Sequence, residues 1–460
     1  MPPYISIVAA SRNDNHGGDL LKRMQIFVSG VLEQCRRHDL SAELILVEWN
    51  PPGDRPPLAE ALRWPEPGPC AVRVIEVPAG IHQRFAHADA LPLHQMIAKN
   101  VGIRRARGEF VLATNIDLLF SDELMRFLAA RALEQDRMYR IDRSDVAADV
   151  PNVPVEQQLA WCEHHMIRIH AATGMSTVTP DGGFHFEEPD IAANGSGIKL
   201  GAGWFAREMH GRQPFRWFDN DAEIFVGGGK KYLQIDIAAG PGVRSGSAML
   251  GPERVGARRT VNIPLSGKPE RIQLHIDRGG DKREGEPRAL NMCVRGLNRS
   301  DSPTRDGIAR AYWALRRAVG RMIYPVPRYA DPAPDFLHLA ACGDFTLLAR
   351  DRWCALRGYP EMETFPMNVD SVLCWAAHYG GAKECVLAAP MRAYHIEHQN
   401  SASGSEHAEF FAGLREKGVP WLDQSEMLRW GFEMARAGAP KIFNGEDWGL
   451  AQEQLQETTR

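Results

Sequence analysis

Long apolar segments are missing from this sequence. The N-terminal run YISIVAA, from Tyr4 to Ala10, is only seven residues long and has no basic flank. A secretory signal would be longer and would carry basic residues, so we interpret this run as a β-strand. No other stretch approaches the roughly 18–20 apolar residues that a transmembrane helix requires. The sequence therefore predicts a protein without a membrane span.

Paired cysteines and a strong charge of one sign are also missing. The eight cysteines are scattered without a Cys-x-x-Cys pair, which is typical of reduced thiols in a cytosolic protein. The net charge of −4 argues against general binding to nucleic acid. The chain does have 460 residues, of which 44% are hydrophobic and 24% charged. This composition is typical of a globular protein with two or three domains.

The most informative stretch runs from His94 to Phe120. It begins as a helix, breaks at Gly108 and continues with the apolar run Phe110–Ala113, which is typical of a strand buried on both faces. That strand places Asn115 and Asp117 at its carboxyl end, where open α/β sheets bind their ligands. An amide oxygen and a carboxylate suit a hard divalent cation, which could neutralise a diphosphate. A polar turn without any ligand is the alternative.

Strands and helices alternate in the first part of the chain. Apolar runs at residues 4–10, 44–47 and 72–77 predict strands, and a helix begins near Asp19. This order predicts a parallel, doubly wound sheet. The pattern further predicts a helix, a loop and a helical tail, in that order, over Val155–Ala171, Thr173–Gly203 and Glu406–Arg460.

The hydrophobic period changes between Phe215 and Leu297. Apolar and polar residues alternate there in short runs separated by turns, namely Leu233–Ile237, Val261–Leu265, Ile272–Ile276 and Leu290–Val294. Such alternation predicts an antiparallel β-sandwich, and it is an insertion because the α/β pattern resumes afterwards. We therefore expect four parts: an α/β part, the sandwich, the rest of the α/β part and C-terminal helices, at 1–200, 201–299, 300–404 and 405–460.

The segment Asp306–Ile323 predicts a basic amphipathic helix, with several arginines outside its apolar stripe. Two interpretations are open. The helix could lie on an anionic membrane surface, or its stripe could pack on the core while the arginines face water. We expect a cytoplasmic protein, and the first interpretation would add peripheral contact with the inner face of the membrane.

Two motifs carry a resemblance to a known family. One is K-N-x-G-x-x-x-A-x-G-E-F from Lys99, followed by Asn115-Ile116-Asp117, and the other is G-D-F-x-L-L-x-R-x-x-W-x-x-L-x-G-Y-P-E from Gly343. Together they resemble the GT-A-type nucleotide-sugar glycosyltransferases, most closely family 2, over Pro3–Asp142 and Leu337–Asn400. The resemblance implies a GT-A fold, with a Rossmann-like, doubly wound and mostly parallel sheet that the sandwich interrupts. The family's D-x-D metal motif has a carboxylate where this chain has Asn115.

The resemblance also implies residues that hold the donor. The turn after the first strand and the acidic end of the second would bind the nucleoside, at Ala10, Ser11, Arg12 and Glu48. Carboxylates accept from base or ribose groups, and arginine binds phosphate oxygens. Lys99 would contact the diphosphate, with Asn115 beside it. From the residues alone, Arg12 and Glu48 could equally form an ion pair, and Lys99 could be a solvated helix charge.

Metal ligands and a catalytic base follow from the same resemblance. Asp117 would hold the cation with two late histidines, His395 and His398, and imidazole ligands favour Mn²⁺ over Mg²⁺. Asp370 matches the family's general base, which takes a proton from a sugar hydroxyl. The residues alone leave open that Asp370 caps the helix Val372–His378 and that either histidine is structural.

These assignments imply an inverting glycosyltransferase. It would move a sugar from a nucleotide diphosphate, UDP rather than GDP, to a saccharide or a lipid-linked acceptor. A retaining reaction stays open because it needs no such base. The alternative is a GT-A-like scaffold without catalysis that binds carbohydrate or takes part in assembly, and Asn115 in place of a carboxylate favours it.

Overall fold

The computed structural model describes residues 2–66, 68–171, 174–178, 184–186, 191–192, 197–201, 203–210, 213–218, 220–243, 248–250, 253–255, 258–268, 270–277, 289–303, 337–398 and 405–460. The chain folds into two compact units. The α/β unit comprises Met1–His185, Pro334–Asp423 and Glu433–Arg460, and the β unit comprises Phe186–Ala333 and Gln424–Phe432. The predicted amphipathic helix Asp306–Ile323 lies outside the described residues.

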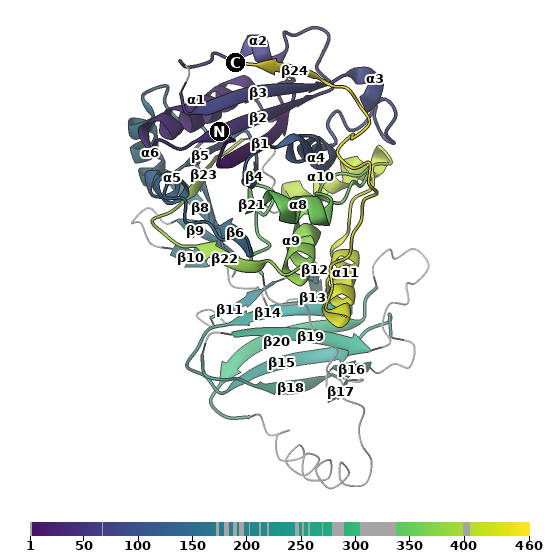
Figure 1. The fold of residues 1–460 in the computed structure, drawn as a ribbon. Helices are drawn as coiled ribbons and strands as arrows, with labels where there is room; N and C mark the ends of the chain where they lie inside the picture. Colours follow the sequence, from purple (N-terminus) through teal and green to yellow (C-terminus); the bar gives the residue numbers. More distant parts are fainter. Residues whose placement is uncertain are drawn as a thin grey trace. The chain divides into compact units, whose positions relative to one another are not determined.

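An eight-stranded sheet forms the centre of the α/β unit (Figure 1). Its strand order is β22-β6-β21-β4-β1-β2-β3-β24. In that order the strands span Lys383–Leu387, Arg137–Ile141, Phe345–Ala349, Phe110–Thr114, Ile5–Ser11, Ala42–Trp49, Cys70–Val77 and Gln456–Thr459. The strands β1 to β4 pair in parallel, as do β22 and β6, whereas β21 and β24 run antiparallel to their neighbours. The prediction of an α/β protein with a mostly parallel sheet is confirmed.

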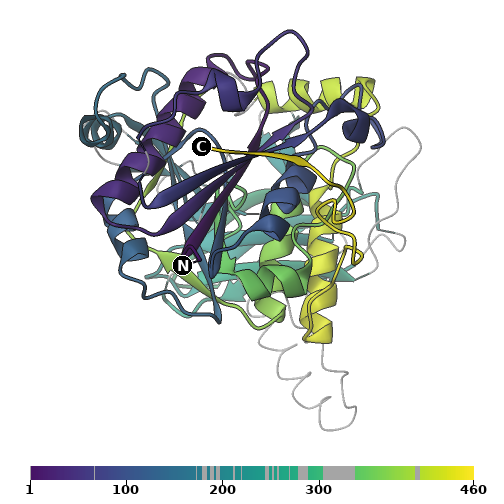
Figure 2. The same ribbon diagram turned by 45° about the horizontal axis from the view of Figure 1, so that its top comes forward.

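Helices cover both faces of this sheet (Figures 1 and 2). On one face, α1 (Leu20–Arg37) shares an apolar cluster with Ile7. On the other, α4 (Gln95–Arg105) approaches so closely that a Cβ on Gly102 would lie 2.5 Å from Val8. Because successive strand residues face opposite sides, β1 is buried along its whole length. Further helices are α2 (Leu58–Ala61), α3 (Ala79–His82), α5 (Asp122–Ala129), α6 (Val155–His164), α8 (Arg350–Leu356), α9 (Val369–Tyr379), α10 (Ser405–Glu416) and α11 (Gln424–Ala437).

A second sheet of the α/β unit has the order β10-β9-β8-β7-β23-β5. In that order its strands span Phe184–Phe186, Gly174–Val178, Met166–Ala171, Arg143–Val146, Ala393–Ile396 and Leu118–Phe120. The strand β23 runs parallel to β7 and antiparallel to β5. This pairing joins a strand from the last quarter of the chain to β5, which follows the turn after β4, and it places His395 opposite Leu118.

Two predictions fail between Val155 and Gly203. The helix expected over Val155–Ala171 ends at His164, and β8 follows as a strand. Residues 166–171 alternate between two faces, with Arg168 and His170 on one side, so a period of two overrides the helical pattern there. The loop expected over Thr173–Gly203 contains β9, β10 and β11.

The β unit consists of two five-stranded sheets, ordered β11-β14-β19-β16-β17 and β12-β13-β20-β15-β18. The strands of the first span Ile198–Leu200, Asp221–Val226, Glu270–Asp277, Ala248–Leu250 and Glu253–Val255, and those of the second Trp204–His210, Gln213–Phe218, Met292–Ser300, Tyr232–Ala239 and Arg259–Pro264. The described pairs are antiparallel, and buried residues of both sheets form one apolar cluster. The predicted alternation of Leu233, Ile235 and Ile237 is confirmed, because all three are fully buried.

The C-terminal tail combines the expected helices with one strand that was not expected. The strand β24 pairs antiparallel with β3 at the edge of the main sheet. Its sequence QETT is polar and mostly exposed, so it carries no apolar alternation from which a strand could be predicted. Among the described residues, no helix has the length and apolar character needed to cross a membrane.

Candidate metal centre

A cavity of about 520 Å³ opens beside the carboxyl ends of β1 and β4. This is the edge at which parallel α/β sheets bind ligands. Its lining is rich in charge, with four arginines, four histidines and three aspartates: Arg12, Arg23, Arg143, Arg168, His16, His170, His395, His398, Asp14, Asp117 and Asp344. The cavity also has an apolar side that includes Leu91 and Phe365.

Asp117 lies in the turn between β4 and β5. The turn is held by β23, since the backbone N–H of Ile396 donates to the carbonyl of Asp117 over 2.9 Å. The preceding strand β4 is an apolar run that is buried throughout, so its end is firmly placed. Pairing of β5 with β23 then brings His395, and three residues later His398, to the same turn.

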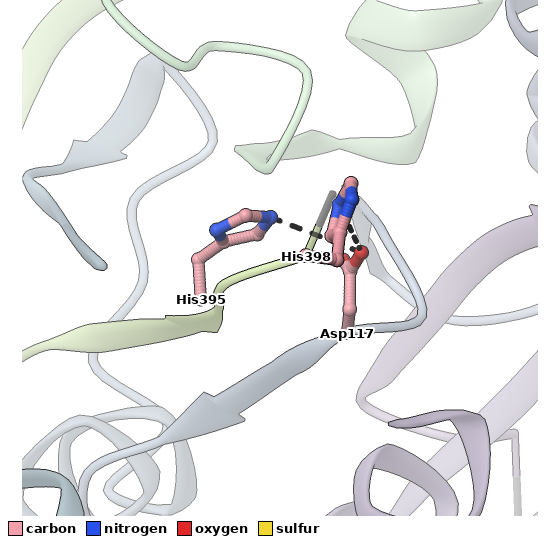
Figure 3. Close-up of side chains that lie close together, drawn as sticks. All are labelled: Asp117, His395 and His398. Carbon is pink, nitrogen blue, oxygen red and sulfur yellow. Dashed lines mark ion pairs between the residues drawn. The ribbon is translucent and has the colours of Figure 1, made fainter. Parts of the chain in front are cut away.

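The three predicted metal ligands converge (Figure 3). From Asp117 Oδ2, the Nε2 atom of His398 lies 3.4 Å away and that of His395 lies 3.8 Å away. One possible ligand atom from each residue lies within 4.8 Å of the others. The second carboxylate oxygen of Asp117 is buried and has no hydrogen-bond partner among the described residues. One carboxylate and two imidazoles therefore form a donor set that fits a divalent cation.

A second carboxylate, Asp145 on β7, supports this metal triad of Asp117, His395 and His398. Its Oδ1 atom lies 3.2 Å from His395 Nδ1, on the side of the imidazole that faces away from Asp117. Metal-binding histidines commonly have a carboxylate in this position, which fixes the orientation of the ring. Asp145 has no exposed surface and also pairs with Arg168 at 3.0 Å.

Charge at the triad is stabilised by its neighbours. Burial alone would raise the pKa of Asp117, but His395, His398 and Arg23 outweigh it and lower that pKa. Burial alone would also raise the pKa of Asp145, but His170, His395 and Arg143 outweigh this effect and lower that pKa. Both carboxylates are therefore charged at neutral pH, as metal coordination requires.

Arg23, in the first turn of α1, also contacts the triad. Its Nη1 donates to Asp117 Oδ2 over 3.0 Å. Its Nη2 donates to the carbonyls of His16 and Gly18 over 2.6 and 3.0 Å. The loop comes close to the triad at Gly17, which has a φ of +68° and where a Cβ would lie 2.8 Å from His398 Nδ1. A side chain there would be strained and would clash.

The predicted nucleoside residues divide into two groups. Ala10, Ser11 and Arg12 line the cavity, and Arg12 donates from Nε to the carbonyl of Asn50 over 3.0 Å. Glu48 does not line it. It is buried and accepts from the backbone N–H of Leu58 over 2.8 Å, and burial raises its pKa to about 7. Glu48 is therefore a buried residue that holds the backbone at Leu58 and does not contact the cavity directly.

Two further predicted residues lie outside the cavity lining. Lys99 is fully buried, and its Nζ donates to the carbonyl of Gly343 over 2.7 Å. The alternative of a solvated helix charge is therefore wrong, whereas the diphosphate contact stays a prediction for a residue that does not line the cavity. Burial lowers its pKa to about 8. Asp370 accepts from the N–H of Ser371 over 2.9 Å, and burial raises its pKa. The N-cap of α9 is Asn368, so Asp370 is not the cap either.

Asn115 lines the cavity but its amide is engaged elsewhere. Its Nδ2 donates to Asp344 Oδ1, and its Oδ1 accepts from Gln95 Nε2 over 2.9 Å. An aspartate at this position would place two carboxylates against each other, which raises the free energy of the folded state. The amide therefore suits its surroundings, and Asn115 is not part of the metal triad.

Sequence reasoning missed Arg23, Asp145 and Asp344. In the sequence, Arg23 cannot be distinguished from other positively charged residues of its helix. Asp344 lies in the motif that begins at Gly343, but the resemblance assigned no role to this aspartate. For Asp145, a usable signal was the alternation of Arg143 with Asp145 and of Arg168 with His170, since adjacent strands in register pair such residues.

A scan against protein-family models and a search of curated proteins both give no match to this chain.

Proposed function

We propose that the protein is a GT-A-type glycosyltransferase that transfers a sugar from a nucleotide diphosphate, preferentially a UDP-sugar, to a saccharide or lipid-linked acceptor. The observation that carries the proposal is the convergence of Asp117, His395 and His398 at the carboxyl edge of a mostly parallel sheet, beside a charged cavity. In this proposal the β unit is an inserted sandwich that leaves the donor site to the α/β unit.

The metal triad would hold a divalent cation, with Mn²⁺ favoured by its two imidazoles. When bound, such a cation supplies positive charge for the diphosphate leaving group. The chain's own residues provide the rest. Arg12 and the turn after β1 bind the nucleotide from the cavity wall, and Asp145 orients His395. Preorganised charge of this kind stabilises a transition state in which negative charge develops.

Asp370 is not assigned the role of general base in this proposal. It lies outside the cavity lining, and a base must reach the hydroxyl it deprotonates. Asp370→Asn is accordingly expected to change sugar transfer by only a few-fold. A loss of about 10²–10⁴-fold, with donor binding intact, would restore the base assignment.

A second candidate is a GT-A-like protein that binds carbohydrate, or assembles with other proteins, without catalysis. It is favoured by Asn115, whose amide is held by Asp344 and Gln95 so that one carboxylate alone serves the triad. Release of UDP from a panel of UDP-sugars with Mn²⁺ separates the two candidates. The proposed enzyme releases UDP from at least one donor and stops when EDTA is added. Binding of UDP without release from any donor would favour the second candidate.

A further inference from the structure

Arg23 shares a single carboxylate oxygen with the two histidines of the metal triad. Its Nη1 lies 3.0 Å from Asp117 Oδ2, closer than either imidazole. The side chain of Arg23 is only 4% exposed, and it also lines the cavity. A buried arginine normally needs a fixed anionic partner, and here that partner is the proposed metal ligand.

Arg23 and a divalent cation compete for this oxygen. A cation held by Asp117 and the two histidines would bring two positive charges close to the guanidinium, among side chains that are largely buried. The repulsion lowers the affinity of the triad for the cation as long as Arg23 keeps its position. An anion that pairs with the guanidinium removes this repulsion, and arginine pairs well with phosphate oxygens.

The other cavity arginines are not placed to act in this way. Arg12 pairs with Asp14, and Arg143 pairs with Asp145 and Asp344. Arg168 pairs with Asp145 and Glu397. Of the cavity-lining arginines, Arg23 is the one for which the structure describes an ion pair with Asp117.

We propose that Arg23 is a diphosphate-binding residue that couples anion binding to cation binding. It neutralises Asp117 and occupies Oδ2 until the diphosphate takes its guanidinium, and both carboxylate oxygens then become available to the cation. Cation and diphosphate therefore bind cooperatively, each raising the affinity for the other by the same factor. The inference rests on the proposed function for the identity of the anion, but the competition at Asp117 stands on geometry alone.

Calorimetric titration of Mn²⁺ into the full chain, with and without saturating UDP, tests this coupling. Formation of the Mn²⁺–UDP complex in solution is measured separately and subtracted. We expect UDP to raise the Mn²⁺ affinity of the wild type about tenfold or more. In Arg23→Gln, the affinity for Mn²⁺ alone should rise about tenfold, because the competing charge is gone, and UDP should add little. The matched control is Lys22→Gln, which removes one exposed charge from the same helix and should behave as wild type.

A second variant and a second anion make each outcome decisive. Arg23→Lys keeps the charge without the planar fork, so its affinity for Mn²⁺ alone should lie between those of the wild type and Arg23→Gln. Equal affinity for Mn²⁺ alone in all three proteins overturns the inference. If inorganic pyrophosphate raises the Mn²⁺ affinity of the wild type but UDP does not, the nucleotide donor is wrong and the role of Arg23 stands. If none of the three proteins binds Mn²⁺ under any condition, both proposals fail.

Discussion

The α/β unit and the β unit bury different kinds of side chain. In the α/β unit, Lys99, Arg140 and Asp145 have no exposed surface. In the β unit, Glu223 and Asn291 are the only buried polar side chains among the residues described there. Removing a charge from water costs several kcal/mol unless partners surround it, so buried charge collects where the fold or a ligand requires it. The difference points to the α/β unit as the part of the chain that carries chemistry.

Not all buried charge in the α/β unit is functional. Arg140 donates to the carbonyls of His338, Ala340 and Cys342, and so satisfies a turn whose backbone would otherwise lack partners. Asp117 differs, because one of its oxygens is buried without a hydrogen-bond partner among the described residues and the residue lines the cavity together with the two histidines of the triad. A buried charged group whose polar atoms all have hydrogen-bond partners has a structural role. A buried charged group with an unpartnered atom at a cavity indicates a ligand.

The largest expected effect comes from removing the carboxylate of the metal triad in the α/β unit, compared with removing a carboxylate in the β unit. Asp117→Ala should lower UDP release by about 10²–10³-fold or more, because it removes the only carboxylate of the triad. The control is Asp236→Ala in the β unit, which breaks an exposed ion pair with Arg258 and should leave UDP release unchanged. Comparable losses in both variants would contradict the contrast between the units.

The next effect concerns the carboxylate behind the triad. Asp145→Asn should weaken Mn²⁺ binding by about 10–100-fold, because His395 loses the group that orients its ring. Titration of Mn²⁺ by calorimetry measures this loss. The variant should also unfold at lower denaturant concentration, since Arg143 and Arg168 lose a charged partner. Unchanged Mn²⁺ affinity would show that Asp145 is structural only.

Much of the fold could be predicted because its strands are apolar runs. The strands β1, β2 and β4 are buried on both faces, as is most of β3, and largely apolar sequence is the pattern of such strands. The strand β24 could not be predicted, because a polar edge strand depends on a partner that lies far away in the sequence. The end of α6 was missed because six residues of β8 can be read with either period.

For the site, residue type was more informative than position in an element. Asp117 could be predicted because a carboxylate at a strand end suits a divalent cation. His395 and His398 were expected only from the family resemblance, since the residues alone left open that either histidine is structural. The burial of Lys99 could not be predicted, for a different reason. A lysine on a helix looks solvated in sequence, and only tertiary packing shows that its Nζ is buried against Gly343. Arg23 was missed for the same reason.

A smaller effect should appear in the pH dependence of stability. Burial raises the pKa of Glu48 from 4.5 to about 7, so the folded state binds a proton that the unfolded state releases. Stability therefore falls as pH rises from 4.5 to 7, by at most about 3 kcal/mol at 1.36 kcal/mol per pKa unit. Glu48→Gln should remove this part of the pH dependence in urea unfolding at pH 5 and pH 8. An unaltered difference in the free energy of unfolding between pH 5 and pH 8 would mean that Glu48 does not cause this pH dependence.

The smallest expected effect follows from deleting the β unit's main segment. Replacing residues 186–333 with a short Gly/Ser linker should leave UDP affinity within about twofold, because the cavity-lining residues belong to the α/β unit. Circular dichroism confirms that the shortened chain is folded, and calorimetry measures UDP binding. A folded deletion variant that no longer binds UDP would mean that the β unit builds part of the donor site.

In the proposed function, Asp117, His395 and His398 bind a divalent cation together with a nucleotide diphosphate. Anomalous diffraction at the manganese absorption edge, from crystals of the full chain grown with Mn²⁺ and UDP, tests this binding. We expect one strong anomalous peak in contact with an oxygen of Asp117 and the Nε2 atoms of both histidines, next to the diphosphate. UDP bound in the cavity without a manganese peak at these three side chains would contradict it.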